Sequence, residues 1–323
     1  MLKKMNHLLE RAMPVITPAS LVIGVLLADG FEAYAFLVPW IFAFMTFTGS
    51  LSSNFQALTR VISHPFSMFV ALFILHIFMP LWAWVLGHVM FSGDMFTITG
   101  LFLAAVIPTG ITSFIWVSIH KGNIPLALTI ILIDTFLSPF IVPYSLSLVA
   151  GEKVHMDVWG MMQGLFFMVV LPSILGMVLN QVTDGEVKDR LGVRLSPFSK
   201  IGLAAVVMLN SAVVAPYLSH IDKKIVSIAC VVFMLSFSGY LFSWLVGTWL
   251  KRGREEIVVL TFTGGMRNIS AGAVLAVSYF PAAVAVPVVL GILFQQVLAS
   301  FYGHMLHRYY HKSIQNNAIH GGM

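Results

Sequence analysis

Charged residues are scarce in this sequence. Only 10% of its 323 residues are Asp, Glu, Lys or Arg, whereas 59% are hydrophobic; soluble domains average about 25% charged residues. The net charge of +5 does not indicate a nucleic-acid partner, because the basic residues lie between apolar runs and form no patch. The composition therefore predicts an all-α polytopic membrane protein, with the lipid bilayer as its surroundings.

Cysteine and catalytic motifs are also nearly absent. Cys230 is the only cysteine and lies in an apolar run, so one chain can form neither a disulfide framework nor a thiolate metal site. No His-Glu-x-x-His motif occurs, and the few ionisable residues inside apolar runs, such as Arg267, Asp134 and His76, do not resemble a catalytic cluster. We expect no enzyme activity, no cofactor, no metal site and no obligate protein partner.

Apolar runs are what the sequence has in abundance. Ten candidate membrane spans lie at about 14–28, 33–50, 66–90, 97–119, 124–149, 157–182, 198–217, 225–250, 256–280 and 283–306. Of the 18 Lys and Arg residues, 14 fall on the side of the N-terminus, three fall on the other side and Arg267 falls inside a span. This positive-inside bias predicts a multi-pass protein of the plasma membrane with both termini in the cytoplasm.

Two of the runs are interrupted by polar residues, glycine and proline. The fourth contains Pro108–Ser113, and the ninth contains Thr263–Ser270. Irregular backbone at membrane depth is tolerated only where it faces protein or water. Each break is in the fourth span of a set of five, which predicts two inverted five-helix repeats, 1–150 and 151–310, followed by a cytoplasmic tail, 311–323.

Broken fourth and ninth helices are expected to cross near the midplane, where transporters of this architecture bind substrate. Half-helix N-termini and the positive charge of Arg267 suit an anionic substrate. The alternative interpretation is that Gly110, Gly264 and Gly265 only allow helices to pack closely.

Asp134 is the only carboxylate inside a predicted membrane core, which makes it the natural partner of Arg267. Three interpretations stay open: a fixed ion pair between Asp134 and Arg267, a carboxyl group that carries a coupling proton, or an interfacial position at the end of its helix.

The motifs resemble those of the bile acid:sodium symporter family. The break at Pro108–Ser113 is followed by Lys121-Gly122-Asn123, the later break contains Gly265-Met266-x-Asn268, and His64-Pro65 precedes Met79-Pro80. The resemblance covers nearly the whole chain and implies a panel domain of helices 1, 2, 6 and 7 and a core domain of helices 3, 4, 5, 8, 9 and 10. It also implies alternating access and organic-anion substrates: bile acids, sulfated steroids or, in bacterial members of the inner membrane, small acids such as pantoate.

The sequence departs from the family at the sodium sites. The positions that hold sodium ligands in the family are Phe114, Ala127, Ile131, Thr263, Arg267 and Leu75, with His76 adjacent to the last. Sodium, a hard cation, requires oxygen ligands, and a guanidinium about 4 Å away would repel it by about 4 kcal/mol at an effective dielectric near 20. We predict that both family sodium sites are absent and that Arg267 replaces a cation.

The candidate site has two parts. The predicted substrate ligands are Thr112, Ser113, Arg267, Asn268, Gln295 and Gln296, and the predicted crossover or coupling residues are Thr109, Gly110, Asp134, Thr263, Gly264, Gly265 and His76. The two glutamines align with a His-Asn pair near the substrate in the family, although polar residues in membrane helices also serve as hydrogen-bonding contacts between helices, contributing about 0.6 kcal/mol each.

The leading hypothesis is a secondary transporter of a small organic anion that does not depend on sodium. The alternatives are a sodium-coupled symporter with a remodelled site and a receptor that binds the anion without moving it. Proton symport, facilitated diffusion and anion exchange all stay open.

Overall fold

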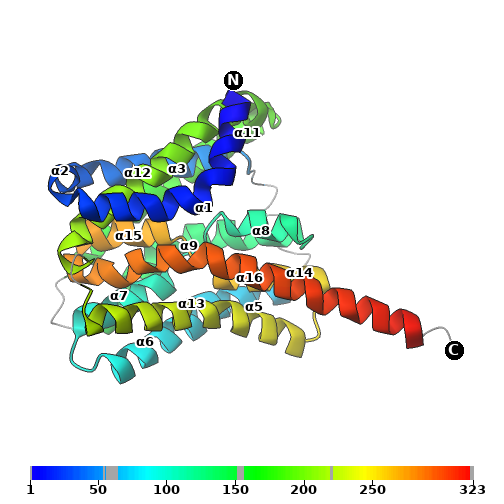
Figure 1. The fold of residues 1–323 in the computed structure, drawn as a ribbon. Helices are drawn as coiled ribbons and strands as arrows, with labels where there is room; N and C mark the ends of the chain where they lie inside the picture. The colour runs from blue at the N-terminus through cyan, green and yellow to red at the C-terminus, as the bar shows by residue number, and fades with distance from the viewer. Residues whose placement is uncertain (1, 54, 56–64, 151–155, 219–220, 321–323) are drawn as a thin grey trace.

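The computed structural model describes residues 2–53, 55, 65–150, 156–218 and 221–320, with side chains except at 2–4, 7, 10, 11, 13, 14, 150 and 311–320. In this part of the chain every regular element is a helix and no β-strand occurs (Figure 1). Helices satisfy all their backbone hydrogen bonds internally, as a chain in lipid must. The all-α polytopic prediction is confirmed.

Seven helical segments are long and apolar enough to cross a membrane: Ala28–Ser50, Pro65–Met90, Ile124–Val149, Val158–Val182, Lys188–Leu218, Lys223–Trp249 and Ala282–Tyr310. Three shorter apolar helices, Val15–Leu26, Met95–Val106 and Ile269–Tyr279, fall in other predicted spans. The arrangement as two inverted five-helix repeats stays a prediction, as do the repeat boundaries and the panel and core domains.

One group of helices packs along the upper part of the molecule in Figure 1. It contains α1 (Leu2–Leu26), α3 (Val38–Ser50), α11 (Leu171–Val182) and α12 (Val193–Leu218), preceded or connected by α2 (Ala28–Phe31), the 3₁₀ helix η1 (Glu32–Leu37), α10 (Val158–Leu165) and the π-helices η4 (Phe166–Val170) and η5 (Lys188–Gly192). Helix α12 is the centre of this group, because it packs against both α1 and α3.

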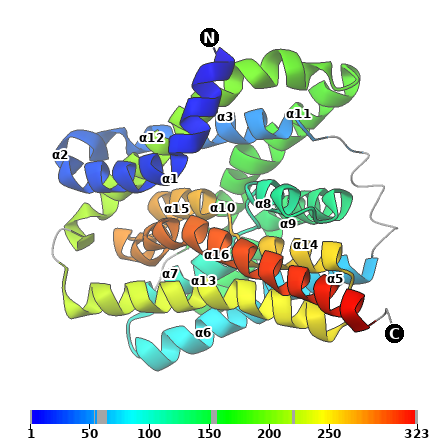
Figure 2. The same ribbon diagram turned by 45° about the vertical axis from the view of Figure 1, so that its right-hand side comes forward.

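The remaining helices form the lower part of the molecule (Figures 1 and 2). They are α5 (Pro65–Phe73), η3 (Ile74–Phe78), α6 (Met79–Met90), α7 (Met95–Val106), α8 (Ser113–Ile119), α9 (Ile124–Ala150), α13 (Lys223–Trp249), α14 (Arg254–Gly265), α15 (Ile269–Tyr279) and α16 (Ala282–His320). Helix α16 packs against α7, α13 and α15, and it also meets α12 of the upper group. The segment expected as a C-terminal tail continues α16 as far as His320.

Two of the long helices contain a π-helical turn directly before a proline. The turns η3 and η4 are followed by Pro80 and Pro172, at the second position of α6 and α11. Proline lacks an N–H, and its ring collides with the carbonyl four residues earlier, so the ordinary helical bond to His76 or Met168 cannot form. The wider π-helical turn re-bonds the backbone at this point, and such turns are common at functional sites.

Candidate functional site

The site is built where two helices break. Helix α7 ends at Val106, and Ile107 has extended backbone angles, φ −56° and ψ 147°, because a residue before proline is driven out of the helical region. The chain becomes helical again at Ser113 in α8. The second break separates α14, which ends at Gly265, from α15, which begins at Ile269.

The two breaks pair with each other through their backbones. Thr109 and Arg267 form an isolated antiparallel bridge, in which the Gly110 N–H donates to Met266 O at 3.1 Å and the Asn268 N–H donates to Pro108 O at 2.8 Å. A Cβ on Gly110 would lie 3.0 Å from the Arg267 carbonyl oxygen, so a larger residue would crowd this close approach. Each break thus supplies hydrogen-bond partners that the interrupted helix of the other lacks.

Thr109 joins this crossover to helix α9. Its backbone N–H donates to Asp134 Oδ2 at 2.6 Å, and its hydroxyl lies 2.8 Å from Thr263 O and 2.9 Å from Met266 O. Both Thr109 and Asp134 are buried. Asp134 thus lies within α9 and not at its end, and its carboxylate is enclosed by the crossover; its depth in the membrane, on which the interfacial interpretation depends, stays a prediction.

Asp134 pairs with His76 and not with Arg267. His76 Nε2 lies 2.8 Å from Asp134 Oδ1, with 8% of the His76 side chain and none of the Asp134 side chain exposed. Arg267 forms no ion pair with Asp134 among the described residues, although the carboxylate attracts the guanidinium over a longer distance. The structure thus argues against the fixed Asp134–Arg267 pair as a direct contact.

Arg267 is buried, with 6% of its surface exposed. Its backbone N–H donates to the Gln295 side-chain oxygen at 3.0 Å. The terminal guanidinium nitrogens, Nη1 and Nη2, have no hydrogen-bond partner in the described part of the chain. The same holds for the hydroxyl of Ser113, at the start of α8. Buried groups of this kind are normally hydrogen-bonded, so these unpaired donors are where a ligand would act.

The other predicted ligands have partners of their own. The Asn268 side chain accepts from the Ala271 N–H at 3.3 Å and caps α15, and the Gln296 side-chain oxygen accepts from the Trp116 indole N–H at 3.2 Å. Thr112 is half-buried beside Gly110. The six predicted ligand residues thus lie on the two breaks and on α16, and their contact with a substrate stays a prediction.

Gly264 and Gly265, the last residues of α14, are packed tightly against α13. A Cβ on Gly264 would collide with the Ser243 hydroxyl, and one on Gly265 would collide with the ring of Tyr240. The Tyr240 hydroxyl in turn donates to the backbone oxygen of Gln295 at 3.0 Å. Gly264 and Gly265 thus allow close helix packing and also form the end of α14 at the crossover, so the two interpretations of these glycines are compatible.

The residues at the family's sodium positions offer few oxygen ligands. Leu75, Ala127 and Ile131 are buried, and with Phe114 they offer no side-chain oxygen. The hydroxyl of Thr263 donates to Val259 O within its own helix at 2.8 Å. Because sodium needs a shell of oxygens, these residues do not fit it.

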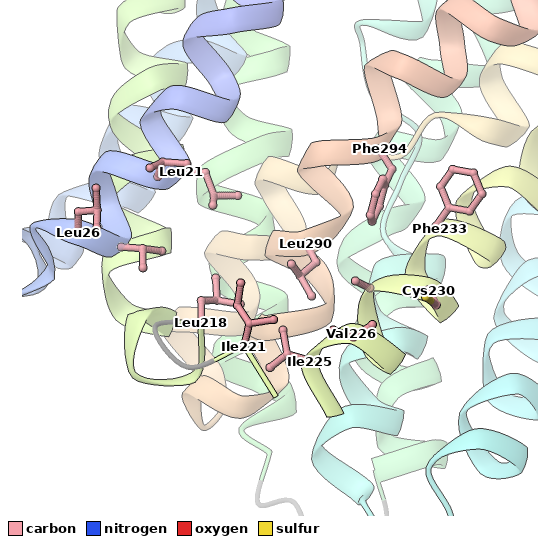
Figure 3. A pocket seen from close by; sticks show the side chains of 13 residues that line it. Leu21, Leu26, Leu218, Ile221, Ile225, Val226, Cys230, Phe233, Leu290 and Phe294 are labelled. Atoms are coloured by element: carbon pink, nitrogen blue, oxygen red, sulfur yellow. The ribbon is translucent and has the colours of Figure 1, made fainter. Parts of the chain in front are cut away.

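An apolar groove lies beside this site, and sequence reasoning did not anticipate it. It has a volume of about 680 Å³ and is lined from α1, α12, α13 and α16, with Leu21, Cys230, Leu290 and Phe294 among its walls (Figure 3). Phe294 directly precedes Gln295, the acceptor for the Arg267 N–H. The consecutive helices α12 and α13 build the groove together with α1 and α16, which lie far from them in the sequence, so no local motif could have revealed it.

Comparison with known proteins gives a consistent result. The sequence pattern of the Sodium Bile acid symporter family matches residues 39–221, more than half of the chain. An uncharacterized protein of Bacillus subtilis, YbaS, is 60% identical over 297 residues, which cover 92% of this chain and 97% of that protein.

Two more distant relatives carry transport names. The uncharacterized sodium-dependent transporter YocS of Bacillus subtilis is 24% identical over 86% of both chains. The probable chloroplastic sodium/metabolite cotransporter BASS1 of Oryza sativa is 29% identical over 56% of this chain and 44% of its own length. These matches agree with the two broken helices and their crossover: the chain is a multi-pass membrane transporter, not an enzyme, and it belongs to the bile acid:sodium symporter family.

Proposed function

We propose that this chain is a secondary transporter that moves a small organic anion by alternating access and without sodium, with the Arg267 guanidinium as the fixed cation of its site. The observation that carries the proposal is that Nη1 and Nη2 of this arginine are buried and have no hydrogen-bond partner in the described structure. Buried hydrogen-bond donors without an acceptor are unfavourable, and a carboxylate or sulfate that accepts from both nitrogens would satisfy them.

Sodium independence is supported by the residues at the family's cation positions. Leu75, Ala127 and Ile131 present hydrocarbon there, and Arg267 adds a positive charge that repels a second cation. The two relatives described above whose names contain sodium are 29% and 24% identical to this chain, so a change of driving ion between them and this protein is compatible with the comparisons.

The apolar groove supports an anion with a hydrocarbon body. Its volume of about 680 Å³ is typical of sites for small organic molecules, and its wall at Phe294 adjoins Gln295. A bile acid, a steroid conjugate or a shorter acid such as pantoate would place its charge at Arg267 and its carbon skeleton towards the groove. We further propose a plasma-membrane location with both termini in the cytoplasm, on the basis of the positive-inside bias.

The experiment that tests the proposal is a thermal-shift screen of organic anions, including taurocholate and pantoate, with sodium replaced by choline. A ligand that binds only the folded protein raises its melting temperature. We expect at least one anion to do so in the absence of sodium.

Two variants make the screen specific. Arg267→Gln should weaken binding of that anion by about ten- to a hundredfold, the effect of losing a charged hydrogen bond. Arg190→Gln is the matched control, because Arg190 is largely exposed and pairs with Glu186 on the surface. Stabilisation that appears only when sodium is added, or that survives in Arg267→Gln, would contradict the proposal.

A further inference from the structure

A buried His–Asp pair adjoins the crossover. His76 lies in the π-helical turn η3, and its Nε2 is 2.8 Å from Asp134 Oδ1 on α9. The other carboxylate oxygen accepts from the backbone N–H of Thr109, the residue bridged to Arg267. The pair is thus linked to the proposed anion site through Thr109, which binds Asp134 and pairs with the backbone of Arg267.

The imidazole ring of His76 is the unusual group. Both of its nitrogens are buried, and neither makes a hydrogen bond of ordinary geometry among the described residues, although Nε2 lies 2.8 Å from Asp134 Oδ1. When Nε2 carries a hydrogen and faces the carboxylate, Nδ1 holds a free lone pair. That lone pair is where a further proton would bind.

The charges facing His76 can be counted. The turn η3 packs against α5, α6 and α7. Helices α5 and α7 carry no titratable side chain, and α6 carries only His88, which contacts its own helix at Trp84 O.

On the side of the crossover, three titratable groups lie near His76. They are Asp134 of α9, Arg267, and Tyr240 of α13, whose hydroxyl donates to the backbone oxygen of Gln295. Tyr144 of α9 is exposed, and Glu255 and Glu256 are at the far end of α14.

With a neutral His76, the charges of Asp134 and Arg267 therefore cancel. An organic anion at Arg267 leaves one negative charge uncompensated in a buried site, which is unfavourable. A proton on His76 restores neutrality, so each of the two ligands favours the binding of the other.

We propose that the His76–Asp134 pair binds the proton that accompanies the organic anion through this site. The proton from the entry side adds to His76 Nδ1, Nε2–H stays beside the Asp134 carboxylate, and the same proton leaves from Nδ1 on the other side, so that no other bond changes. This inference rests on the proposed function, since it supplies the driving ion for the anion held by Arg267.

The test is solid-state ¹⁵N NMR of histidine-labelled full-length protein in lipid bilayers between about pH 5 and 8, the range in which histidine changes charge. The variant His76→Gln identifies the His76 signal by its loss, and His88→Gln is the matched control on the same long helix. If His76→Gln does not fold, the signal is identified by magnetisation transfer from Nε2 to the ¹³C-labelled carboxylate of Asp134.

The expected result is that the His76 signal changes from the neutral to the protonated form within this range. The change should move to higher pH in Arg267→Gln, because a nearby positive charge that opposes protonation is removed, and His88→Gln should leave it unaltered. A His76 that stays neutral throughout, or a transition that Arg267→Gln does not move, would overturn the inference.

The anion screen is a separate measurement. Anion stabilisation that depends on Arg267, together with a His76 that never titrates, would overturn the proton inference alone. A titrating His76 in a protein that no anion stabilises would instead overturn the proposed function.

Discussion

Thr109 connects three segments of the site. Its backbone N–H is bound by Asp134, its hydroxyl reaches the carbonyls of Thr263 and Met266, and its backbone pairs with Arg267. The Thr263 carbonyl depends on that hydroxyl, because the Arg267 N–H that would bind it in a continuous helix donates to Gln295 instead. Replacing the Thr109 hydroxyl with a methyl group therefore tests how much the crossover stabilises the protein.

Thr109→Val should lower the melting temperature, since it leaves the buried Thr263 carbonyl without a donor at a cost of about 1–3 kcal/mol. Thr109→Ser keeps the hydroxyl and should melt close to the wild type. Thermal unfolding in detergent, followed by tryptophan fluorescence, measures both. Equal melting temperatures for the valine and serine variants would show that the hydroxyl contributes nothing.

The sequence predicts which residues belong to the site better than it predicts how they pair. Polar and glycine residues inside apolar runs identified both breaks, Arg267 and Asp134, because lipid makes such residues unfavourable unless they have a function. The pairing of Asp134 with His76 could not be derived. It joins residues of two different helical segments, and His76 lies in a π-helical turn that residue identities alone do not predict.

At the scale of elements, the two broken helices depend on close packing as well as on backbone pairing. Gly264 is the clearest case, because α13 passes so near that a Cβ would collide with the Ser243 hydroxyl. That hydroxyl donates to Gly239 O within its own helix, and it has no partner role at the crossover. Its removal should therefore make room without breaking the site.

Gly264→Ala should lower the melting temperature, because overpacking a tight contact costs about 1–3 kcal/mol. Adding Ser243→Ala should recover part of the loss, since the nearest atom to the new methyl group would then be the Ser243 Cβ, at 3.0 Å. Gly30→Ala is the control, because a Cβ there meets nothing within 4 Å. The same melting measurement decides, and a double variant no more stable than Gly264→Ala would contradict the packing argument.

The breaks themselves were predictable from local chemistry. Pro108 removes a backbone donor and forces Ile107 out of the helix, and adjacent glycines allow α14 to end beside α13. The apolar groove was not predictable, because its walls come from α1, α12, α13 and α16. Its existence depends on packing between distant helices, which the side-chain identities alone do not determine.

At the scale of the whole molecule, the chain has the features of its family but lacks the side chains that would bind the family's usual driving ion, sodium. The all-helical fold, the paired breaks and the family match describe one kind of transporter. The residues at its sodium positions do not fit a hard cation, whereas the buried guanidinium of Arg267 has two nitrogens without a partner among the described residues. We therefore propose sodium-free transport of an organic anion as the defining property of this protein.

Uptake into proteoliposomes tests that claim most directly. The protein is reconstituted, loaded with the anion that stabilises it, and assayed for counterflow of the radiolabelled anion with choline replacing sodium on both sides. We predict exchange that is undiminished without sodium, retained in Arg190→Gln and lost in Arg267→Gln. Binding without exchange, as in a receptor, or exchange that requires sodium would contradict sodium-free transport by this protein.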